Sequence, residues 1–129
     1  MPLGVDIYQE MIYNRVMSGL FKPDLSALVL GTLAAGPKHG YAITRAIREA
    51  GRGNLTLGEG QLYPVLHRLQ ELGFVSAEWH AQTGKPSRKV YTITEKGKRR
   101  LAKQRREWSE VSAGISSILM QASKADNHG

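Results

Sequence analysis

Apolar residues recur at helical spacing along this chain, and the stretch 58–73 shows the pattern most clearly. Its apolar positions fall at intervals of three and four, which predicts a helix with one buried face: Leu62, Val65, Leu66, Leu69 and Leu72. The opposite face carries polar, charged and aromatic groups, namely Gln61, Tyr63, Pro64, His67 and Arg68. The pattern therefore predicts an amphipathic helix that presents groups able to donate, accept, stack or carry charge.

The start of this helix depends on Pro64. Thr56 and Glu59 fit the S/T-x-x-E capping box. A start directly after Thr56 would place Pro64 in the helix interior, where it should kink the helix at a cost of about 3 kcal/mol. A start near residues 60–61 places Pro64 close to the first turn, where proline is tolerated. We expect the later start, and either start leaves free amide groups near Gln61 that suit a phosphate.

The first residues predict an N-terminal helical arm over 1–22. One face of this helix is apolar and includes Val5, Tyr8, Met11, Ile12, Val16 and Leu20. Such a helix must bury its apolar face. It could pack on its own domain or across a dimer interface, and the sequence leaves both open.

Two core helices are predicted next. The first runs from about Asp24, as N-cap, to Ala35, and its buried stripe is Leu25, Leu28, Val29 and Leu33, with Leu30 nearby. The second runs from about His39 to Ala50, with an inner face of Ile43, Ala46, Ile47 and Ala50. Together with the helix in 58–73, they suggest a helix-turn-helix with an unusually long connection.

After Gly73 the period changes from helical to alternating. Residues 74–80 and 88–93 read as two strands, and 81–87 reads as a polar turn with Lys85 at its tip. Trp79 is expected to pack on the first of these strands. The predicted fold is mainly α with a small two-stranded β-wing, a winged helix-turn-helix over residues 23–93. In such a fold one helix enters the major groove of DNA and the wing contacts the backbone or minor groove.

The last predicted element is a long helix from Thr94, as N-cap, to about Gln121. Apolar residues repeat in heptads at Leu101, Trp108, Ile115 and Ala122, with a second row at Val111 and Ile118. This pattern predicts a dimerisation helix over 94–125 that pairs with a copy of itself. About 28 residues would reach roughly 40 Å, enough to hold two reading helices one DNA turn apart. Residues 126–129 are expected to form a disordered tail.

The net charge of +7 bears on function, because the excess of Lys and Arg over Asp and Glu is clustered in one part of the chain. Ten of the eighteen Lys and Arg residues lie between Lys85 and Arg106, where Glu95 is the only acid. A charge run alone would suggest a solvated surface, but beside a winged helix it favours nucleic acid.

Several classes of protein are disfavoured. The chain has no cysteine, no apolar run long enough for a membrane span and no signal-peptide pattern at its start, so we expect a cytoplasmic protein without membrane association. The carboxylates are scattered, and His39, His67 and His80 lack metal-ligand spacing. We therefore expect no enzyme, no metal and no cofactor.

Three signatures in order resemble the PadR family of bacterial transcriptional regulators. They are His39-Gly40-Tyr41, then Leu62-Tyr63-Pro64 with Leu66 and Arg68-Leu69, and finally Lys89-Val90-Tyr91-Thr92-Ile93-Thr94 before Gly97. The resemblance covers roughly residues 25–108 and is closest to the short-tailed branch, because one long helix follows the wing. It implies a homodimeric winged-helix repressor that binds double-stranded DNA at a pseudo-palindromic operator, often released by a small aromatic effector.

The resemblance and the residue pattern together give a set of expected DNA contacts. These are Lys38, His39, Tyr41, Gln61, Tyr63, His67, Arg68, Lys85, Arg88 and Lys89. Gln61 departs from the Ser or Thr that the family often has there, although Gln can pair with an adenine edge. The expected dimer contacts are Tyr8, Met11, Ile12, Leu101, Trp108, Val111, Ile115 and Ile118.

Two alternatives stay open. Trp108 resembles a tryptophan that stacks on flat ligands in short-tailed relatives, but it could equally be a plain interface anchor. The whole protein could instead be a winged-helix module that binds protein or RNA, without operator specificity.

Overall fold

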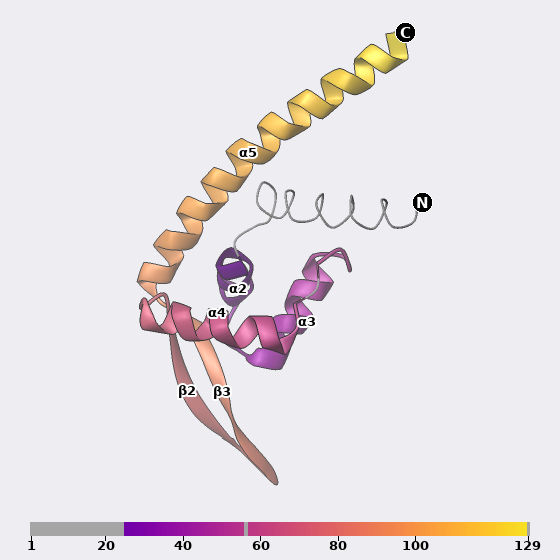
Figure 1. Ribbon diagram of the computed structural model, residues 1–129. Helices are drawn as coiled ribbons and strands as arrows, with labels where there is room; N and C mark the ends of the chain where they lie inside the picture. Colours follow the sequence, from indigo (N-terminus) through magenta and orange to yellow (C-terminus); the bar gives the residue numbers. More distant parts are fainter. Residues whose placement is uncertain (1–24, 56, 129) are drawn as a thin grey trace, which may run out of the picture.

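The computed structural model describes residues 25–55 and 57–128, and it describes side chains as far as residue 121. The predicted N-terminal arm, with Tyr8, Met11 and Ile12, lies outside the described residues, as do the predicted caps Asp24 and Thr56. The described elements, in chain order, are α2 (Leu25–Leu33), β1 (Lys38–His39), α3 (Gly40–Ala50), α4 (Glu59–Glu71), β2 (Val75–Gln82), β3 (Lys85–Ile93) and α5 (Glu95–His128) (Figure 1).

Three short helices and the base of the sheet enclose the core. α2 contacts α3, α4 and α5, while α4 also contacts β2. The residues with the least exposure are the predicted apolar positions of these helices: Val29, Leu30, Leu33, Ile43, Leu62 and Leu66. The helical periodicity therefore identified the core, because each of these helices buries one stripe of its surface.

Three positions on the inner faces differ from the prediction. Ala50 is exposed at the last residue of α3, whereas Thr44 is buried, because its hydroxyl donates to the Tyr41 carbonyl oxygen at 2.8 Å and so needs no water. Leu72 was expected in the apolar stripe of α4, but the helix ends at Glu71 and Leu72 is 43% exposed.

The sheet has three strands instead of the two predicted. β1 pairs antiparallel with β3, with Lys38 opposite Tyr91 and His39 opposite Val90, so the strand order is β1-β3-β2. The sequence pattern missed β1 because two residues cannot show alternation. This strand fixes the start of α3 to the edge of the wing.

The wing is longer and its turn tighter than predicted. β2 and β3 approach each other until Gln82 lies opposite Lys85, which leaves only Thr83 and Gly84 in the turn. Gly84 has φ of 70°, a backbone conformation that glycine adopts without strain. The irregular register between the His80–Arg88 and Gln82–Lys85 pairs indicates an extra residue in β3 near this turn.

α5 begins directly after β3, as predicted, with Thr94 as the single residue between them. The backbone N–H of Gly97 donates to Thr94 Oγ1 at 3.0 Å, which confirms the N-cap, and Thr94 Oγ1 donates to the Gly73 carbonyl oxygen at 2.7 Å. A β-carbon on Gly97 would overlap the carbonyl oxygen of Phe74, so only glycine permits this close approach.

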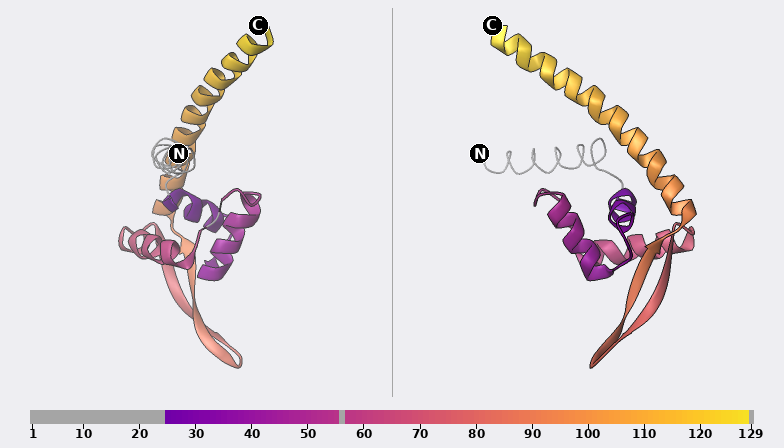
Figure 2. Two further views of the ribbon diagram at one scale, coloured as in Figure 1. Left: turned by 45° about the vertical axis from the view of Figure 1, so that its right-hand side comes forward. Right: turned by 180° about the vertical axis from the view of Figure 1, so that it is seen from behind.

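Two expectations for α5 are wrong. Leu101 is 6% exposed and lies in the core of its own domain, so it is not available to a dimer partner. The helix continues through 126–127 to His128, beyond the predicted end at Gln121 and into the expected tail. Past its first turns α5 leaves the domain and projects away from the wing (Figure 2). None of the helices in the described ranges has the length and apolarity of a membrane span.

Candidate nucleic-acid interface

The first residues of α3 and the first turns of α4 meet at Gly40 and Tyr63. A β-carbon placed on Gly40 would lie 2.6 Å from the Tyr63 hydroxyl oxygen and 3.0 Å from the carbon that bears it. The tyrosine ring therefore lies directly over Gly40, which is buried, while the residue as a whole remains 46% exposed. Two of the sequence signatures, His39-Gly40-Tyr41 and Leu62-Tyr63-Pro64, thus form one contact.

Tyr63 also lies close to β3. Burial raises the pKa of the Tyr91 hydroxyl, and the neighbouring Tyr63 hydroxyl raises it further, so Tyr91 remains neutral at physiological pH. The Lys89 ammonium lies 5.7 Å from the centre of the Tyr91 ring. The third signature, within β3, therefore lies beside the other two.

His39 is the N-cap of α3, because its Nδ1 accepts from the Ala42 N–H at 3.4 Å. Burial lowers the pKa of His39, and the positive charge of Arg88 lowers it further, which favours the neutral ring that can accept this bond. The His39 and Tyr41 rings are nearly parallel, with centres 6.5 Å apart. Tyr41 itself is 60% exposed, so this end of α3 presents an accessible hydroxyl.

Lys38 is engaged within its own domain. Its ammonium donates to the carbonyl oxygens of Thr32 at 2.9 Å and Gly36 at 3.3 Å. The Thr32 carbonyl lies in the last turn of α2 and the Gly36 carbonyl just after it, where a cation satisfies otherwise unpaired acceptors. Lys38, one of the expected DNA contacts, thus acts as a cap for α2.

α4 begins at Glu59, slightly earlier than predicted, with Gly58 as N-cap. Pro64 is therefore inside the helix, and the Gly60 carbonyl oxygen lacks the i+4 N–H that it would normally accept. Gln61 Oε1 accepts from the Gly58 N–H at 3.3 Å, the half of a capping box that a side chain at N3 provides. Gln61 is exposed, but its side chain folds back on its own helix end.

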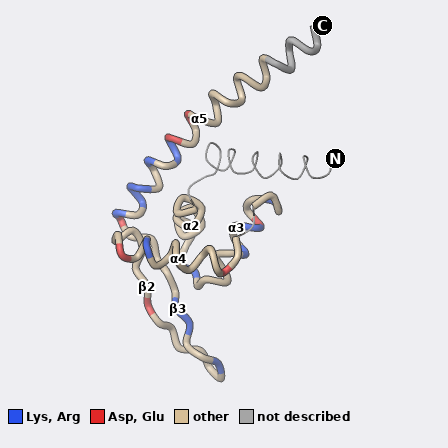
Figure 3. Tube along the Cα trace, in the orientation of Figure 1, with Lys and Arg blue, Asp and Glu red and all other residues tan. Residues whose placement is uncertain are grey.

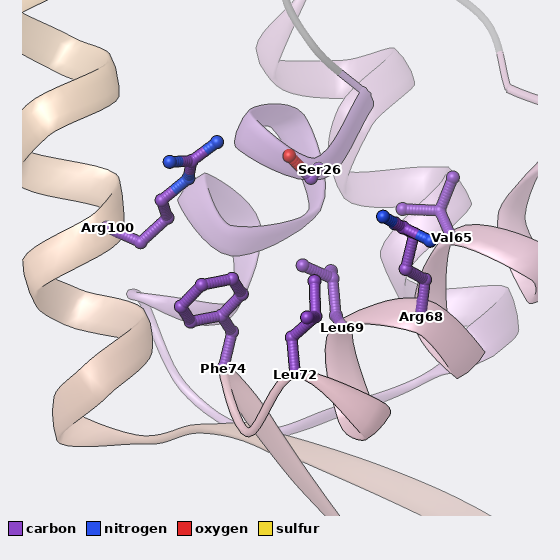
Figure 4. A pocket seen from close by; sticks show the side chains of 7 residues that line it. All are labelled: Ser26, Val65, Arg68, Leu69, Leu72, Phe74 and Arg100. Atoms are coloured by element: carbon purple, nitrogen blue, oxygen red, sulfur yellow. The ribbon is translucent and has the colours of Figure 1, made fainter.

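Arg68 lies on a different side of α4 from Tyr63. Five residues separate them, which is roughly 140° around a helix. Arg68 lines a pocket of about 300 Å³ together with Ser26, Val65, Leu69, Leu72, Phe74 and Arg100 (Figure 4). This pocket lies between α4, α2 and α5, so Arg68 belongs to the face that packs toward α2 and not to the surface around Tyr63.

His67 follows Tyr63 by one helical turn. Its Nε2 lies 3.1 Å from Glu71 Oε1, and both side chains are largely exposed. One of the two ring nitrogens of His67 is therefore engaged by a carboxylate of the same helix. Of the polar face predicted for α4, Tyr63 and His67 thus share one flank, and Gln61 and Arg68 lie on the other.

The cations of the wing divide between its two faces. Paired residues lie on the same face of the sheet, so Lys89, opposite Trp79, shares the face of Tyr91 and Ile93, which contribute to the core. Arg88 lies on the other face, opposite His80, and Lys85 lies there too, opposite Gln82, because the extra residue in β3 interrupts the alternation. Lys89, but not Arg88 or Lys85, therefore extends the surface that Tyr63 begins.

Positive charge continues from β3 into the first half of α5 (Figure 3). Part of this charge has local partners: the Lys96 ammonium donates to the Leu72 carbonyl oxygen at 2.8 Å, and Lys98 lies 3.1 Å from Glu95. The second half of α5 has another character, because Trp108, Val111, Ile118, Leu119 and Met120 are exposed there.

Comparison with known proteins decides the family. The family model described as "Transcriptional regulator PadR-like family" matches residues 29–103, which covers the end of α2, then α3, α4, the wing and the start of α5. The chain belongs to the PadR-like family of transcriptional regulators. This confirms the resemblance drawn from the three signatures. The family is one of transcriptional regulators, which is not an enzyme class.

Similar proteins and structures agree with this assignment. The chain is 34% identical over 77 residues to the negative transcriptional regulator PadR of Bacillus subtilis, a match that covers 60% of this chain and 42% of that protein. A PadR-family regulator from Eggerthella lenta superposes with a TM-score of 0.71 at 28% identity and covers 88% of this chain and 96% of its own. The structure of B. subtilis PadR in complex with operator DNA superposes with a TM-score of 0.57 at 33% identity, over 61% of this chain and 44% of that chain. The chain thus spans less than half the length of B. subtilis PadR.

The sequence did not identify Tyr91 or Gly40 as parts of this site, although both stand in the quoted signatures. Tyr91 was treated as a strand residue, and its position beside Tyr63 depends on the pairing of β1 with β3. Gly40 has no side chain, so its role becomes visible only through the ring that lies over it.

Proposed function

We propose that this PadR-like chain is a dimeric repressor that binds a pseudo-palindromic operator. One observation carries the proposal: Tyr63 lies over Gly40 and beside Tyr91, so the start of α3, the start of α4 and the inner face of β3 form one continuous surface. We call this surface, made by Tyr41, Tyr63 and Lys89 over the buried Tyr91, the tyrosine surface.

The tyrosine surface has the chemistry of a phosphate-binding face. Its exposed tyrosines offer hydroxyl donors and its Lys89 ammonium is positive, while its edge contains the free N–H groups at the first turn of α4. In the region that the structure describes, no ion pair joins Lys85 or Lys89 to a carboxylate. A DNA strand would supply the missing negative charge.

The contacts expected from sequence are revised accordingly. We assign backbone contacts to Tyr41, Tyr63, Lys85 and Lys89, and we place Arg68 outside the contact surface. Gln61 can reach a base only if it releases the Gly58 N–H, which another acceptor such as a phosphate oxygen could then occupy.

Dimerisation is assigned to the second half of α5. Its exposed apolar residues, Trp108, Val111 and Ile118, repeat at spacings of three and seven, and Ile115 completes the pattern. The 34 residues of α5 span about 51 Å, which exceeds the roughly 34 Å between half-sites one DNA turn apart. Within such a dimer, Trp108 of each subunit could stack on a small aromatic effector that releases the DNA.

The test is a binding assay with DNA from immediately upstream of the gene and a shuffled duplex of equal composition. We expect preference for the upstream DNA and a steep loss of affinity with rising salt, because phosphate contacts release counterions. Tyr63→Ala should weaken binding strongly, whereas Arg68→Ala, the matched control on the same helix, should leave it nearly unchanged. Equal affinity for both duplexes would contradict an operator-binding role.

Oligomeric state and effector are tested separately. Val111→Glu with Ile118→Glu should convert a dimer to a monomer in light scattering and reduce operator affinity, while exposed Arg99→Glu should leave the dimer intact. In a Trp79→Phe background, flat aromatic compounds that release DNA should quench Trp108 fluorescence. Effectors that release DNA without any change at Trp108 would exclude Trp108 as their site.

A further inference from the structure

Trp79 lies on β2 in the middle of the wing and is 69% exposed, the largest exposed fraction among the large hydrophobic residues of the described chain. The sequence predicted a packed residue at this position. An exposed tryptophan is unfavourable in water, because folding removes little of its large apolar surface from contact with water. Its position therefore calls for an explanation.

The strand register defines the face on which Trp79 lies. Val75 and Ala77 precede it on the same side of β2 and lie opposite Ile93 and Tyr91. Trp79 lies opposite Lys89, so it continues this row one step beyond the core. In both orientations the wing extends below α4 and curves toward the side of α3 (Figures 1 and 2).

The contacts of Trp79 connect it to the tyrosine surface. The Lys89 ammonium lies 6.0 Å from the Trp79 ring and 5.7 Å from the Tyr91 ring, so it stands between the two aromatic residues. Tyr63, Tyr91, Lys89 and Trp79 thus form a row from α4 along the wing. Trp79 extends this row toward the tip of the wing.

The charge of the wing selects the class of partner. Glu78 is the only acid in β2 and β3, and it lies on the opposite face, 3.6 Å from His80. The face of Trp79 therefore has the Lys89 cation and no carboxylate within these strands. A polyanion with apolar surface beside each charge matches this arrangement, and the sugar–phosphate strand of a duplex has both.

We propose that Trp79 is a DNA-contacting residue, whose ring packs against deoxyribose while Lys89 contacts the adjoining phosphate. The proposal rests on the proposed function, since it requires that the wing bind a duplex. It assigns the wing an uncharged contact in addition to its ammonium groups.

The two kinds of contact respond differently to salt. A lysine that contacts phosphate releases a counterion, so its removal should reduce the slope of log affinity against log salt by roughly 0.9. A tryptophan that packs on sugar releases none. Trp79→Ala should therefore reduce affinity roughly tenfold at every salt concentration and leave the slope unchanged, as expected for an aromatic contact at an interface centre.

The matched control is Glu78→Ala, one residue away on the other face of the wing. This change should leave duplex affinity the same or slightly higher, because it removes only a negative charge. Trp79→Phe should retain part of the affinity that Trp79→Ala loses. Circular dichroism should be the same for all three variants, because the substituted side chains are exposed.

A direct measurement uses Trp108→Phe, which leaves Trp79 as the single tryptophan. Added duplex should protect Trp79 from acrylamide quenching, and the protection should saturate at the stoichiometry of binding. Tight duplex binding without protection of Trp79, or an unchanged affinity of Trp79→Ala, would overturn the proposal. Protection that rises with protein concentration without DNA would assign Trp79 to a protein contact and also overturn it. If no duplex is bound at all, the proposed function fails first.

Discussion

The hydroxyl oxygen of Tyr63 lies 2.6 Å from the position that a β-carbon would occupy on Gly40. α3 therefore has to begin with a residue that lacks a side chain, because the α4 tyrosine covers that point. Through this one contact, the relative position of the two helices determines where the tyrosine ring lies beside Tyr91.

Gly40→Ala should displace the Tyr63 ring and weaken duplex binding to the level of Tyr63→Ala. The clashing atoms are the outer end of a half-exposed side chain, so the ring can move and the free energy of unfolding should fall by only about 1 kcal/mol. The measurement is a double-mutant cycle on affinity. The double variant should bind no worse than Tyr63→Ala alone, and additive losses would show that the two residues act independently.

Gly97→Ala should be strongly destabilising. Its β-carbon would overlap the Phe74 carbonyl oxygen and lie 2.8 Å from Ile93 Cγ1, and a backbone oxygen cannot move aside as a side chain can. We expect a loss of about 2–4 kcal/mol in denaturant unfolding. The control is Gly31→Ala on α2, where no neighbouring atom of the described residues lies within 4 Å and alanine should stabilise by about 0.5–1 kcal/mol. A similar effect at both positions would contradict the close approach at Gly97.

Thr94→Ala should destabilise the junction between the wing and α5. It removes the acceptor for the Gly97 N–H and the donor to the Gly73 carbonyl oxygen. We expect a loss of about 1–2 kcal/mol by chemical denaturation. Thr94→Ser keeps the hydroxyl and should recover most of the loss. If Thr94→Ser were as unstable as Thr94→Ala, the hydroxyl would not be the stabilising group.

His39 should make stability depend on pH. Burial, with Arg88 beside it, lowers the pKa of the folded-state ring below its usual 6.5, so the folded protein binds fewer protons than the unfolded chain in that window. The contribution of His39 is therefore full above about pH 6.5 and is lost as the pH falls through the lowered pKa. Thermal unfolding from pH 8 to pH 5 should show this loss in the wild type.

His39→Asn is the control for that measurement, because asparagine also caps a helix but does not titrate. His67 and His80 remain in both proteins, so their titration cancels in the difference. An identical pH profile for the two proteins would show that His39 has the same pKa folded and unfolded.

The sequence predicted the features that follow from regular spacing along the chain. Leu62, Leu66 and Leu69 were identified as a buried stripe because a helix that covers a core must repeat at this spacing. The N-cap at Thr94 was equally readable, since the hydroxyl has to precede the helix by a fixed number of residues. The family signatures then joined these local patterns into one fold.

Features that depend on contacts between two helices or strands could not be predicted from the sequence. Leu101 satisfies the heptad as well as Trp108 does, but α2 and β3 lie against the first turns of α5 and bury it. The spacing alone cannot distinguish a core that belongs to the same domain from an interface with another subunit.

The residues of the predicted site lie on the expected elements, but their positions relative to one another could not be read from the sequence. Arg68 and Tyr63 both lie on the polar side of α4, yet the neighbours on each flank separate them: α2 on one side and β3 on the other. Trp79 was expected to pack because tryptophans usually do, and only the strand register shows that the core ends one step before it.

The one-residue junction at Thr94 has a mechanical consequence. Because β3 passes into α5 without a flexible connection, the wing and the long helix are rigidly joined at the edge of the domain. Along an α5 of about 51 Å, a tilt of roughly 5° displaces the far end by roughly 4 Å. In the dimer that we propose, any event that changes how the two α5 helices cross would therefore alter the separation of the two wings without unfolding either domain.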